Sequence, residues 1–443
     1  MTKFTDLNLA EPVLRAVLDE GYETPTPIQA RAITPVLNGR DVVGLAQTGT
    51  GKTAAFVLPL ITRLLEQNKQ APGRTCRALI LAPTRELAAQ IGASVETYGK
   101  HAGLTHAVVF GGVKPGPQIK KLATGLDILV ATPGRLLDHM STGKARLDHT
   151  NIVILDEADQ MLDLGFMPAI RKLLSQAAKP RQTVMFSATM PPAIRQLADD
   201  FLKDPVTVAV TPPSKPVERI DQKVFYVNAG DKPDALIELM APDAGKKAIV
   251  FTRTKRGADR VAKRLVSFGH KANAIHGNKS QGQRERALDA FRSGKAPVLV
   301  ATDIAARGLD IDDVAVVVNY ELPNVSESYV HRIGRTARAG AEGRAVSLVA
   351  PDERILLKDI EKLMGKEIPG MNDAPPMPKG DAAKPKHNRG GGGGRGRSGG
   401  GRPQGKGGQR QGGGRPQGQG GGQGGGKPRQ RNRGGRPNAA AQG

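Results

Sequence analysis

The sequence is poor in cysteine and in aromatic residues. Its 443 residues include a single cysteine, Cys76, and no tryptophan, and aromatic side chains make up 3% of the chain. One thiol excludes an intramolecular disulfide and leaves a cysteine-based zinc site without partners. The shortage of aromatic rings argues against the base-stacking platforms of RNA-recognition domains.

Long apolar runs are also missing. No stretch approaches the roughly 18 to 20 apolar residues that a membrane helix needs. The opening residues, MTKFTDLNLAEPVL, lack the basic start and apolar core of a secretion signal. Together with the lone cysteine, these absences predict a protein of the reducing cytoplasm that has no membrane partner.

Acidic residues are outnumbered. There are 65 Lys and Arg against 42 Asp and Glu, which gives a net charge of +23. From residue 371 onward, 15 Lys and Arg face 2 Asp, so more than half of the charge lies in the last sixth of the chain. This excess predicts a polyanionic partner, and nucleic acid is favoured because no amphipathic membrane anchor is visible.

The last segment, residues 371–443, is dominated by Gly, Arg and Gln. It has almost no apolar side chain to bury, so we expect it to be disordered. Two roles remain open for this tail. It is either a spacer or a basic arm that binds RNA phosphates electrostatically, without reading bases.

Before the tail, short β-branched runs alternate with longer segments of helical periodicity. This alternation predicts α/β domains whose parallel sheets are covered by helices. The proline-rich stretch 211–218 is typical of a linker, so we expect domains at 1–210 and 219–370. The runs expected to form strands are 41–46, 77–83, 127–133, 151–157 and 182–189, then 247–253, 297–303, 314–320 and 344–350.

The stretch AQTGTGKT, residues 46–53, has the composition of a phosphate-binding loop. Its glycines let backbone N–H groups face phosphates, and the helix that follows adds partial positive charge. Lys52 would reach the β- and γ-phosphates, and Thr53 would bind Mg²⁺. The general pattern has glycine where this chain has Ala46.

The stretch VILDEADQML, residues 153–162, turns from apolar to acidic within a few residues. A solvated loop after a strand is the simple explanation. A phosphate-binding loop, however, gathers a triphosphate and a divalent cation, and such a site needs carboxylates at a neighbouring strand end. Because consecutive strand residues face opposite sides, two adjacent acids can serve different roles. Asp156 is therefore the candidate metal ligand, through water, and Glu157 the candidate general base.

These stretches and several others resemble the motifs of the DEAD-box family of RNA helicases, in the family's order, over roughly residues 4 to 350. Ala46 matches the family's own form of the phosphate loop. The end of the core and the tail look most like the bacterial RhlE-type branch. The motifs are GYETPTPIQ (21–29), AQTGTGKT (46–53), PTREL (83–87), GG (111–112), TPGR (132–135), DEAD (156–159), SAT (187–189), FTRT (251–254), ATDIAARGLD (301–310) and HRIGRTAR (331–338).

The resemblance implies two tandem RecA-like domains that bind ATP and Mg²⁺. It implies that Gln29 reads the adenine edge, which suits an amide that donates and accepts at once. Phe4 would stack on the ring, Tyr22 and Thr26 would shape the pocket, and Asp310 would contact the ribose. The remaining nucleotide-site positions carried over are Ala46, Gln47, Thr48, Gly49, Thr50, Gly51, Lys52, Thr53 and Gly308.

Two arginines, Arg335 and Arg338, lie three residues apart on an expected helix and hence on one face. Spacing alone also fits a salt-bridged surface. The resemblance implies arginine fingers that reach the γ-phosphate. It further implies that His331 links to the DEAD and SAT segments and that Ser187 and Thr189 relay between the nucleotide and RNA surfaces. With Asp159, these residues would couple the two domains.

For RNA, the resemblance implies backbone contacts with little sequence specificity. The positions that carry it are Pro83, Thr84, Arg85, Gly112, Thr132 and Arg135, then Arg253, Arg284 and Thr302. The expected function is ATP-dependent local unwinding of short RNA duplexes, in ribosome assembly or RNA turnover, with ribosomal or RNA-decay proteins as partners. A non-enzymatic RNA chaperone and an ATP-dependent DNA translocase remain alternatives.

Overall fold

The computed structural model describes residues 2–46, 49–67, 69–210, 220–243, 245–306, 311, 314–337 and 342–373. The expected linker and nearly all of the tail lie outside these residues. Within the described part of the chain, no helix combines the length and apolarity that spanning a bilayer requires.

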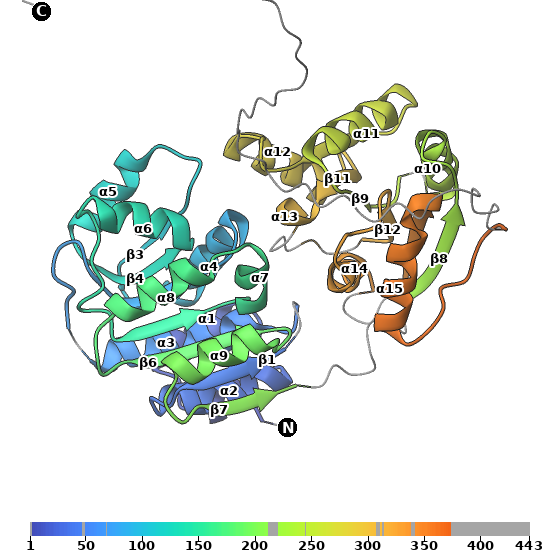
Figure 1. Ribbon diagram of the computed structural model, residues 1–443. Helices are drawn as coiled ribbons and strands as arrows, with labels where there is room; N and C mark the ends of the chain where they lie inside the picture. Colours follow the sequence, from blue (N-terminus) through green and yellow to red (C-terminus); the bar gives the residue numbers. More distant parts are fainter. Residues whose placement is uncertain are drawn as a thin grey trace, which may run out of the picture. The chain divides into compact units, whose positions relative to one another are not determined.

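The first sheet has seven strands, all paired in parallel, in the order β3-β4-β2-β5-β6-β1-β7. Their bounds are β1 Val42–Leu45, β2 Cys76–Leu81, β3 His106–Val109, β4 Leu126–Ala131, β5 Ile152–Leu155, β6 Gln182–Ser187 and β7 Val206–Ala209. Because the strands are parallel, their carboxyl ends meet at one edge of the sheet (Figure 1).

Helices cover both faces of this sheet. Alternate strand residues enter two different cores: Ile152 and Ile154 face one, while Val153 and Leu155 face the other. Helices α1 to α4 pack in the first core and α5 to α9 in the second. The bounds are η1 Phe4–Asp6, α1 Glu11–Asp19, α2 Pro27–Leu37, α3 Lys52–Glu66, α4 Arg85–Tyr98, α5 Pro115–Ala123, α6 Pro133–Ser141, α7 Ala158–Asp163, α8 Met167–Gln176 and α9 Pro192–Phe201.

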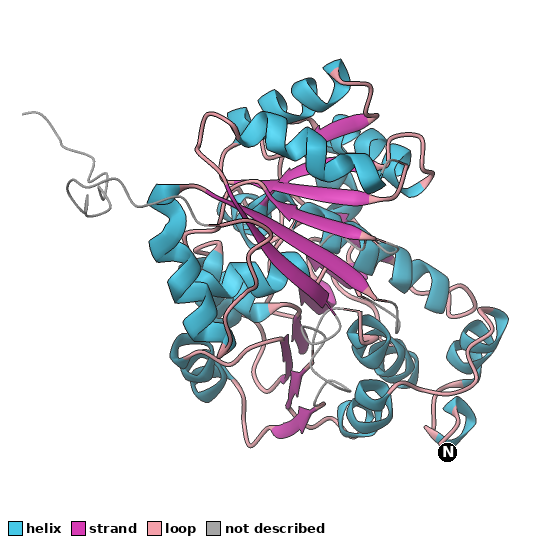
Figure 2. Ribbon diagram, turned by 90° about the vertical axis from the view of Figure 1, so that its right-hand side faces the viewer, coloured by secondary structure: helices cyan, strands magenta, loops and turns pink. Residues whose placement is uncertain are grey.

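The second sheet has six parallel strands in the order β10-β11-β9-β12-β13-β8, again between two cores. In Figure 2 its strands lie side by side with helices packed against them. The strands are β8 Ile220–Tyr226, β9 Ala248–Thr252, β10 Ala272–Ile275, β11 Val298–Thr302, β12 Val316–Asn319 and β13 Gly343–Val349. The helices are α10 Lys232–Met240, η3 Ala241–Asp243, α11 Lys255–Ser267, α12 Gln281–Arg292, α13 Asp303–Ala306, α14 Ser326–Ile333, η4 Pro351–Glu353 and α15 Arg354–Met364.

The expected fold class, parallel α/β sheets covered by helices, is confirmed, and each of the nine runs predicted to be strands overlaps one. Four strands were not predicted: β3, β7, β8 and β10. All four are edge strands, and each has partly exposed positions. An edge strand buries less than a central one, so it lacks the continuous apolar run on which the prediction relied.

Candidate functional site

The order of strands in the first sheet divides its carboxyl edge into two regions. The neighbours β5, β6 and β1 lead into the DEAD stretch, the SAT stretch and the phosphate loop. The neighbours β3, β4 and β2 lead into Gly112, Thr132 and Arg85. Ligand sites of open parallel sheets lie at this edge, so the residues expected to bind the nucleotide and those expected to bind RNA form adjacent groups.

The described part of the expected phosphate loop after Thr48 contains two glycines with left-handed backbone conformations. Gly49 and Gly51 have φ of 86° and 88°, values that side-chain-bearing residues rarely adopt. Helix α3 begins at Lys52, directly after the loop. A Cβ on Gly51 would lie 2.5 Å from Nε2 of Gln29, so the second glycine is also required by close packing.

Gln29 and Thr26 hold this loop from α2. Gln29 Nε2 donates to the carbonyl of Gly51 at 3.1 Å, and Thr26 Oγ1 donates to the carbonyl of Thr50 at 2.9 Å. Gln29 Oε1 also accepts from the backbone N–H of Thr26 at 2.9 Å. Besides any contact with adenine, these two residues therefore fix the shape of the phosphate loop.

The other two residues expected around adenine differ in exposure. Tyr22 is 52% exposed, which suits a pocket wall, whereas Phe4 is 3% exposed and belongs to the first core. A ring with so little free surface cannot stack on a base unless η1 moves. Stacking by Phe4 therefore does not match its position in this structure.

Lys52 and Asp156 place opposite charges in a buried site. Lys52 is 6% and Asp156 2% exposed. Among the described residues Nζ of Lys52 has no hydrogen-bond partner. Burial raises the pKa of Asp156 to about 7, Lys52 acts against this rise, and Glu157 adds to it. A buried ammonium that lacks acceptors, beside a carboxylate that burial disfavours, fits a site for a phosphate and a cation.

Asp156 and Thr53 are the candidate protein ligands for such a cation. Within the described residues, no three His, Cys, Asp or Glu side chains are grouped to hold a metal ion. Mg²⁺ is commonly bound by one or two carboxylates, water and substrate phosphates. Asp156 and the partly buried Thr53 can supply the protein's share of such a shell.

Glu157 is held in a strained backbone conformation. Its φ and ψ are 53° and 54°, and it is the residue before the first turn of α7. Its backbone N–H donates to Oδ1 of Asp156 at 3.0 Å. A left-handed residue other than glycine or asparagine costs of order 1–3 kcal/mol and is typical of functional sites. The strained turn therefore lies at the two buried acids for which the sequence predicts catalytic roles.

Asp159 joins the DEAD stretch to the SAT stretch. Its Oδ2 accepts from the backbone N–H of Thr189 at 2.9 Å and from Thr189 Oγ1 at 2.9 Å. Its own N–H donates to Ser187 Oγ at 3.3 Å, and that hydroxyl donates to the carbonyl of Thr189 at 2.7 Å. Three of the expected coupling residues thus form one hydrogen-bonded unit between β5 and β6.

The residues expected to bind RNA in the first sheet also gather. Thr84 caps α4 by accepting from Leu87 N–H at 3.2 Å, with Pro83 just before it, and Thr132 precedes α6. Gly112 has φ of 79°, and a Cβ there would lie 2.0 Å from Nη1 of Arg85. Burial lowers the pKa of Arg85. Only glycine allows this guanidinium to lie against the loop.

In the second sheet, Arg253 and Thr302 follow or end the neighbouring strands β9 and β11, and Arg284 lies on α12. Arg253 Nη2 donates to Glu353 at 2.9 Å, and its N–H donates to Glu321 at 2.7 Å. Its guanidinium is therefore already partly neutralised, and any phosphate contact must share it with Glu353.

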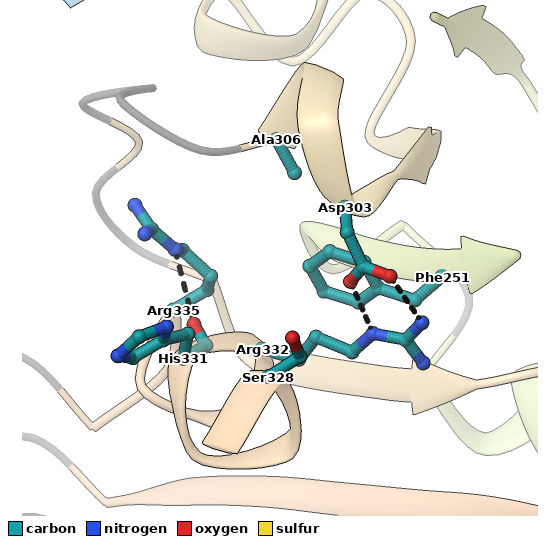
Figure 3. Close-up of a pocket in the computed structure, with 7 residues that line it drawn as sticks. All are labelled: Phe251, Asp303, Ala306, Ser328, His331, Arg332 and Arg335. Carbon is teal, nitrogen blue, oxygen red and sulfur yellow. Dashed lines mark hydrogen bonds and ion pairs between the residues drawn. The ribbon is translucent and has the colours of Figure 1, made fainter. Parts of the chain in front are cut away.

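His331 and Arg335 line a small pocket with Phe251, Asp303, Ala306, Ser328 and Arg332 (Figure 3). The expected helix through Arg335 and Arg338 is wrong, because α14 ends at Ile333. Gly334 and Arg335 form a turn, Ala337 has φ of 56°, and the Thr336 hydroxyl bonds to the carbonyl of Val314. Arg335 is 5% exposed, and its Nε donates to the carbonyl of His331 at 3.3 Å.

Sequence reasoning missed the arginine between these two residues. Arg332 is 1% exposed and makes a bidentate ion pair with Asp303, at 2.6 and 2.8 Å. It also bonds to Asn319 and lies 5.1 Å from the centre of the Phe251 ring. The run HRIGRTAR contains this arginine, but the spacing of its arginines does not show which of them pairs with a carboxylate inside the domain. Arg332 joins α14 to the ends of β11 and β12 and so supports the position of Arg335.

Five predicted site residues lie outside the described residues: Gln47, Thr48, Gly308, Asp310 and Arg338. Their assignments stay predictions. So do the individual ligand contacts assigned to the other site residues.

Comparisons with known proteins agree with this arrangement. Residues 26–197 match the family model described as DEAD/DEAH box helicase, and residues 231–340 match the model described as helicase conserved C-terminal domain. In the solved structure of S. cerevisiae Dbp5 bound to RNA and ADP BeF3, 34% of aligned residues are identical. The TM-score is 0.74, and the match covers 84% of this chain and 95% of that one. This chain therefore shares the architecture of two RecA-like sheets with that helicase structure.

Curated relatives include an ATP-dependent RNA helicase dbp2 of Emericella nidulans and the DEAD-box ATP-dependent RNA helicase RhpA of Helicobacter pylori. The first is 44% identical over 82% of this chain and 65% of its own length. The second is 43% identical over 82% of this chain and 73% of its own length. The chain thus spans just under two thirds of the fungal protein. Fungal and bacterial proteins both match, so the RhlE-type branch stays a prediction.

Proposed function

This chain belongs to the DEAD-box family of RNA helicases, and on that premise we propose that it couples ATP hydrolysis to local unwinding of short RNA duplexes. The observation that carries the proposal is the hydrogen-bonded unit of Asp159, Ser187 and Thr189. It joins the ends of β5 and β6, within the group of strand ends that also carries Lys52, Asp156 and Glu157.

In this proposal, the phosphate loop binds the triphosphate through its backbone N–H groups and Lys52. Thr53 and Asp156 hold Mg²⁺, which when bound neutralises charge on the phosphates. Glu157 accepts a proton from the attacking water as it adds to the γ-phosphorus, and ADP leaves with the bond electrons. Lys52 stays protonated throughout and stabilises the charge that develops on the phosphate oxygens.

Hydrolysis is completed, we propose, by residues of the second sheet. Arg335 and Arg338 reach the γ-phosphate only when the two α/β units close on ATP and RNA together. Closure favoured by both ligands makes ATP turnover depend on RNA and makes the two affinities reciprocal. Stacking and pairing cost roughly 1.4 kcal/mol per step on the DNA scale, so one closure opens a few steps and not a long duplex.

The RNA contacts in the proposal are to the sugar-phosphate backbone, through Arg85, Thr132, Arg253, Arg284 and Thr302. Such contacts give affinity without sequence preference. We place this activity in the cytoplasm, with ribosomal or RNA-decay proteins as partners. The buried free thiol of Cys76 is consistent with a reducing compartment.

The direct test is ATP turnover measured with single-stranded RNA, with duplex DNA and with no nucleic acid. We expect RNA to raise the rate and DNA to leave it near the level without nucleic acid. Equal stimulation by duplex DNA would support a DNA translocase instead. Strand annealing that persists in Lys52→Ala would support a chaperone that needs no ATP.

The tail allows a separate prediction. Deleting residues 377–443 removes 15 Lys and Arg, and we expect RNA affinity to fall and its salt dependence to flatten. Each lost phosphate contact lowers the slope of log K against log salt by about 0.7. The measurement is RNA binding between 50 and 200 mM salt. The matched control replaces the arginines and lysines of the tail with glutamine at constant length. If both variants keep the slope of the full chain, the tail is a spacer.

A further inference from the structure

The loop after β3 contains Gly111 and Gly112, and two side chains hydrogen-bond to its ends. One belongs to Arg135 of the TPGR motif, and the other belongs to Gln118, which lies in none of the motifs. At its start, the carbonyl of Phe110 accepts from Gln118 Nε2 at 3.0 Å. At its end, the carbonyl of Val113 accepts from both terminal nitrogens of Arg135 at 3.2 Å. Gly111 and Gly112 lie between these two anchors. The conformation of the loop is therefore set by α5, which carries Gln118, and by α6, which carries Arg135.

The two anchors also contact each other. Gln118 Oε1 accepts from Arg135 Nη1 at 3.3 Å and from His139 Nε2 at 3.1 Å. The carbonyl of Phe110 needs a donor and Arg135 needs an acceptor, so the orientation of this amide is fixed. The side chain of Gln118 thus uses its amide nitrogen on the loop and its oxygen on Arg135 and His139.

His139 completes the cluster. It is 2% exposed. Burial lowers its pKa, as does Arg135, while Asp138 acts in the opposite direction. A neutral imidazole facing the amide oxygen of Gln118 must carry its proton on Nε2. His139 therefore acts as a donor that keeps Gln118 turned toward the loop.

The geometry of Arg135 supports a role inside the protein. Its side chain is 13% exposed, and its two terminal nitrogens are engaged by Val113 and Gln118. A guanidinium so enclosed has few donors left for a phosphate. Gly112 is exposed and Arg85 is partly buried, and the guanidinium of Arg85 lies against Gly112, so these two residues remain accessible to a ligand.

We propose that Gln118 is a positioning residue of the RNA surface, which acts with Arg135 to hold the Gly111–Gly112 loop and Arg85 in the form that binds the RNA backbone. This inference rests on the proposed function, because it presupposes that the loop contacts RNA. Under this inference, the main role of Arg135 is to hold the conformation of the loop and not to bind an RNA phosphate directly.

The test replaces Gln118 with methionine, which has a similar length and no amide. We expect the RNA concentration for half-maximal ATP turnover to rise roughly 3- to 10-fold, as the loss of one or two buried hydrogen bonds implies. The maximal rate at saturating RNA changes much less, because Gln118 touches neither ATP residues nor substrate. Hydrogen exchange at residues 110–114 should become faster. A purely structural role elsewhere in the domain would not raise the RNA concentration for half-maximal turnover while leaving the maximal rate nearly unchanged.

The control is Gln196→Met, which removes an exposed hydrogen bond to Asp200 within α9 and should change neither the RNA concentration for half-maximal turnover nor the maximal rate. If Gln118→Met does not fold, Gln118→Glu keeps the acceptor for Arg135 and removes the donor to Phe110. Gln118→Glu should then show the same shift, to a smaller extent.

A double mutant tests whether the two residues act together. Combined with Arg135→Met, Gln118→Met should add little to the effect of Arg135→Met alone, because both variants release the same loop. Unchanged RNA dependence in folded Gln118 variants, or fully additive effects with Arg135→Met, overturns the inference. If RNA fails to stimulate the unaltered protein at all, it is the proposed function that fails.

Discussion

Replacing Glu157 with glutamine should lower RNA-stimulated ATP turnover by about 10²- to 10⁴-fold, the range typical of a lost general base. The amide is isosteric with the carboxylate but cannot accept a proton from water. Glu157 lies 3% exposed in a left-handed turn next to Asp156, so the substitution changes the chemistry with little change in volume.

The measurement is steady-state ATP turnover at saturating RNA, together with binding of ATP to the same variant. We expect ATP affinity to persist, since Lys52, Thr53 and Asp156 are unaltered, and RNA affinity in the presence of ATP to increase as the bound state lives longer. The matched control is Glu66→Gln, at the exposed end of α3. Retention of more than a tenth of the activity by Glu157→Gln would assign the base to another group.

Replacing Arg335 with alanine should lower turnover by about 10³- to 10⁵-fold, the range of an arginine finger. In this structure its Nε donates to the carbonyl four residues earlier, that of His331, at 3.3 Å. In the proposed closed state, this contact to its own backbone would be replaced by a contact to a phosphate oxygen. We therefore expect the loss to fall on the rate and not on RNA binding.

Arg286→Ala provides the matched control. Its Nε donates to the carbonyl four residues earlier, that of Gly282, at 3.1 Å, but it lies on the exposed face of α12. Arg335→Lys separates charge from geometry, because lysine keeps the positive charge without the planar fork of donors. Full activity in Arg335→Ala would contradict the finger role and leave Arg338 to be tested alone.

The features predicted from the sequence are those in which the role of a residue depends on its near neighbours in the chain. The phosphate loop, the acids that follow β5 and the central strands were predicted from short stretches, because glycine, lysine and carboxylate roles depend on near neighbours. Sequence reasoning failed where the backbone departs from a regular element. Arg335 was expected on a helix, but α14 ends two residues earlier and Ala337 takes a positive φ.

It also failed where a side chain serves several segments at once. Arg332 and Arg335 lie three positions apart in the same run and both are buried, but Arg332 bonds to Asp303 and Asn319, whereas Nε of Arg335 donates to the carbonyl of His331. Gln118 carries no recognisable motif, because its role depends on α5, α6 and the loop after β3 coming together. Likewise, Phe4 is available to a nucleotide only to the extent that packing leaves its ring uncovered.

The sequence by itself determined the alternation of buried strands and helices, the phosphate-binding turn and the family of the chain, because these depend on composition and spacing within a few residues. Only the tertiary structure decided the order β3-β4-β2-β5-β6-β1-β7. That order places the loops predicted to bind RNA and the loops predicted to bind ATP as neighbours on one edge, and it brings Asp159 next to Thr189 at the ends of the paired strands β5 and β6. Strand order arises from long-range packing of helices on both faces of the sheet, and no local pattern encodes it.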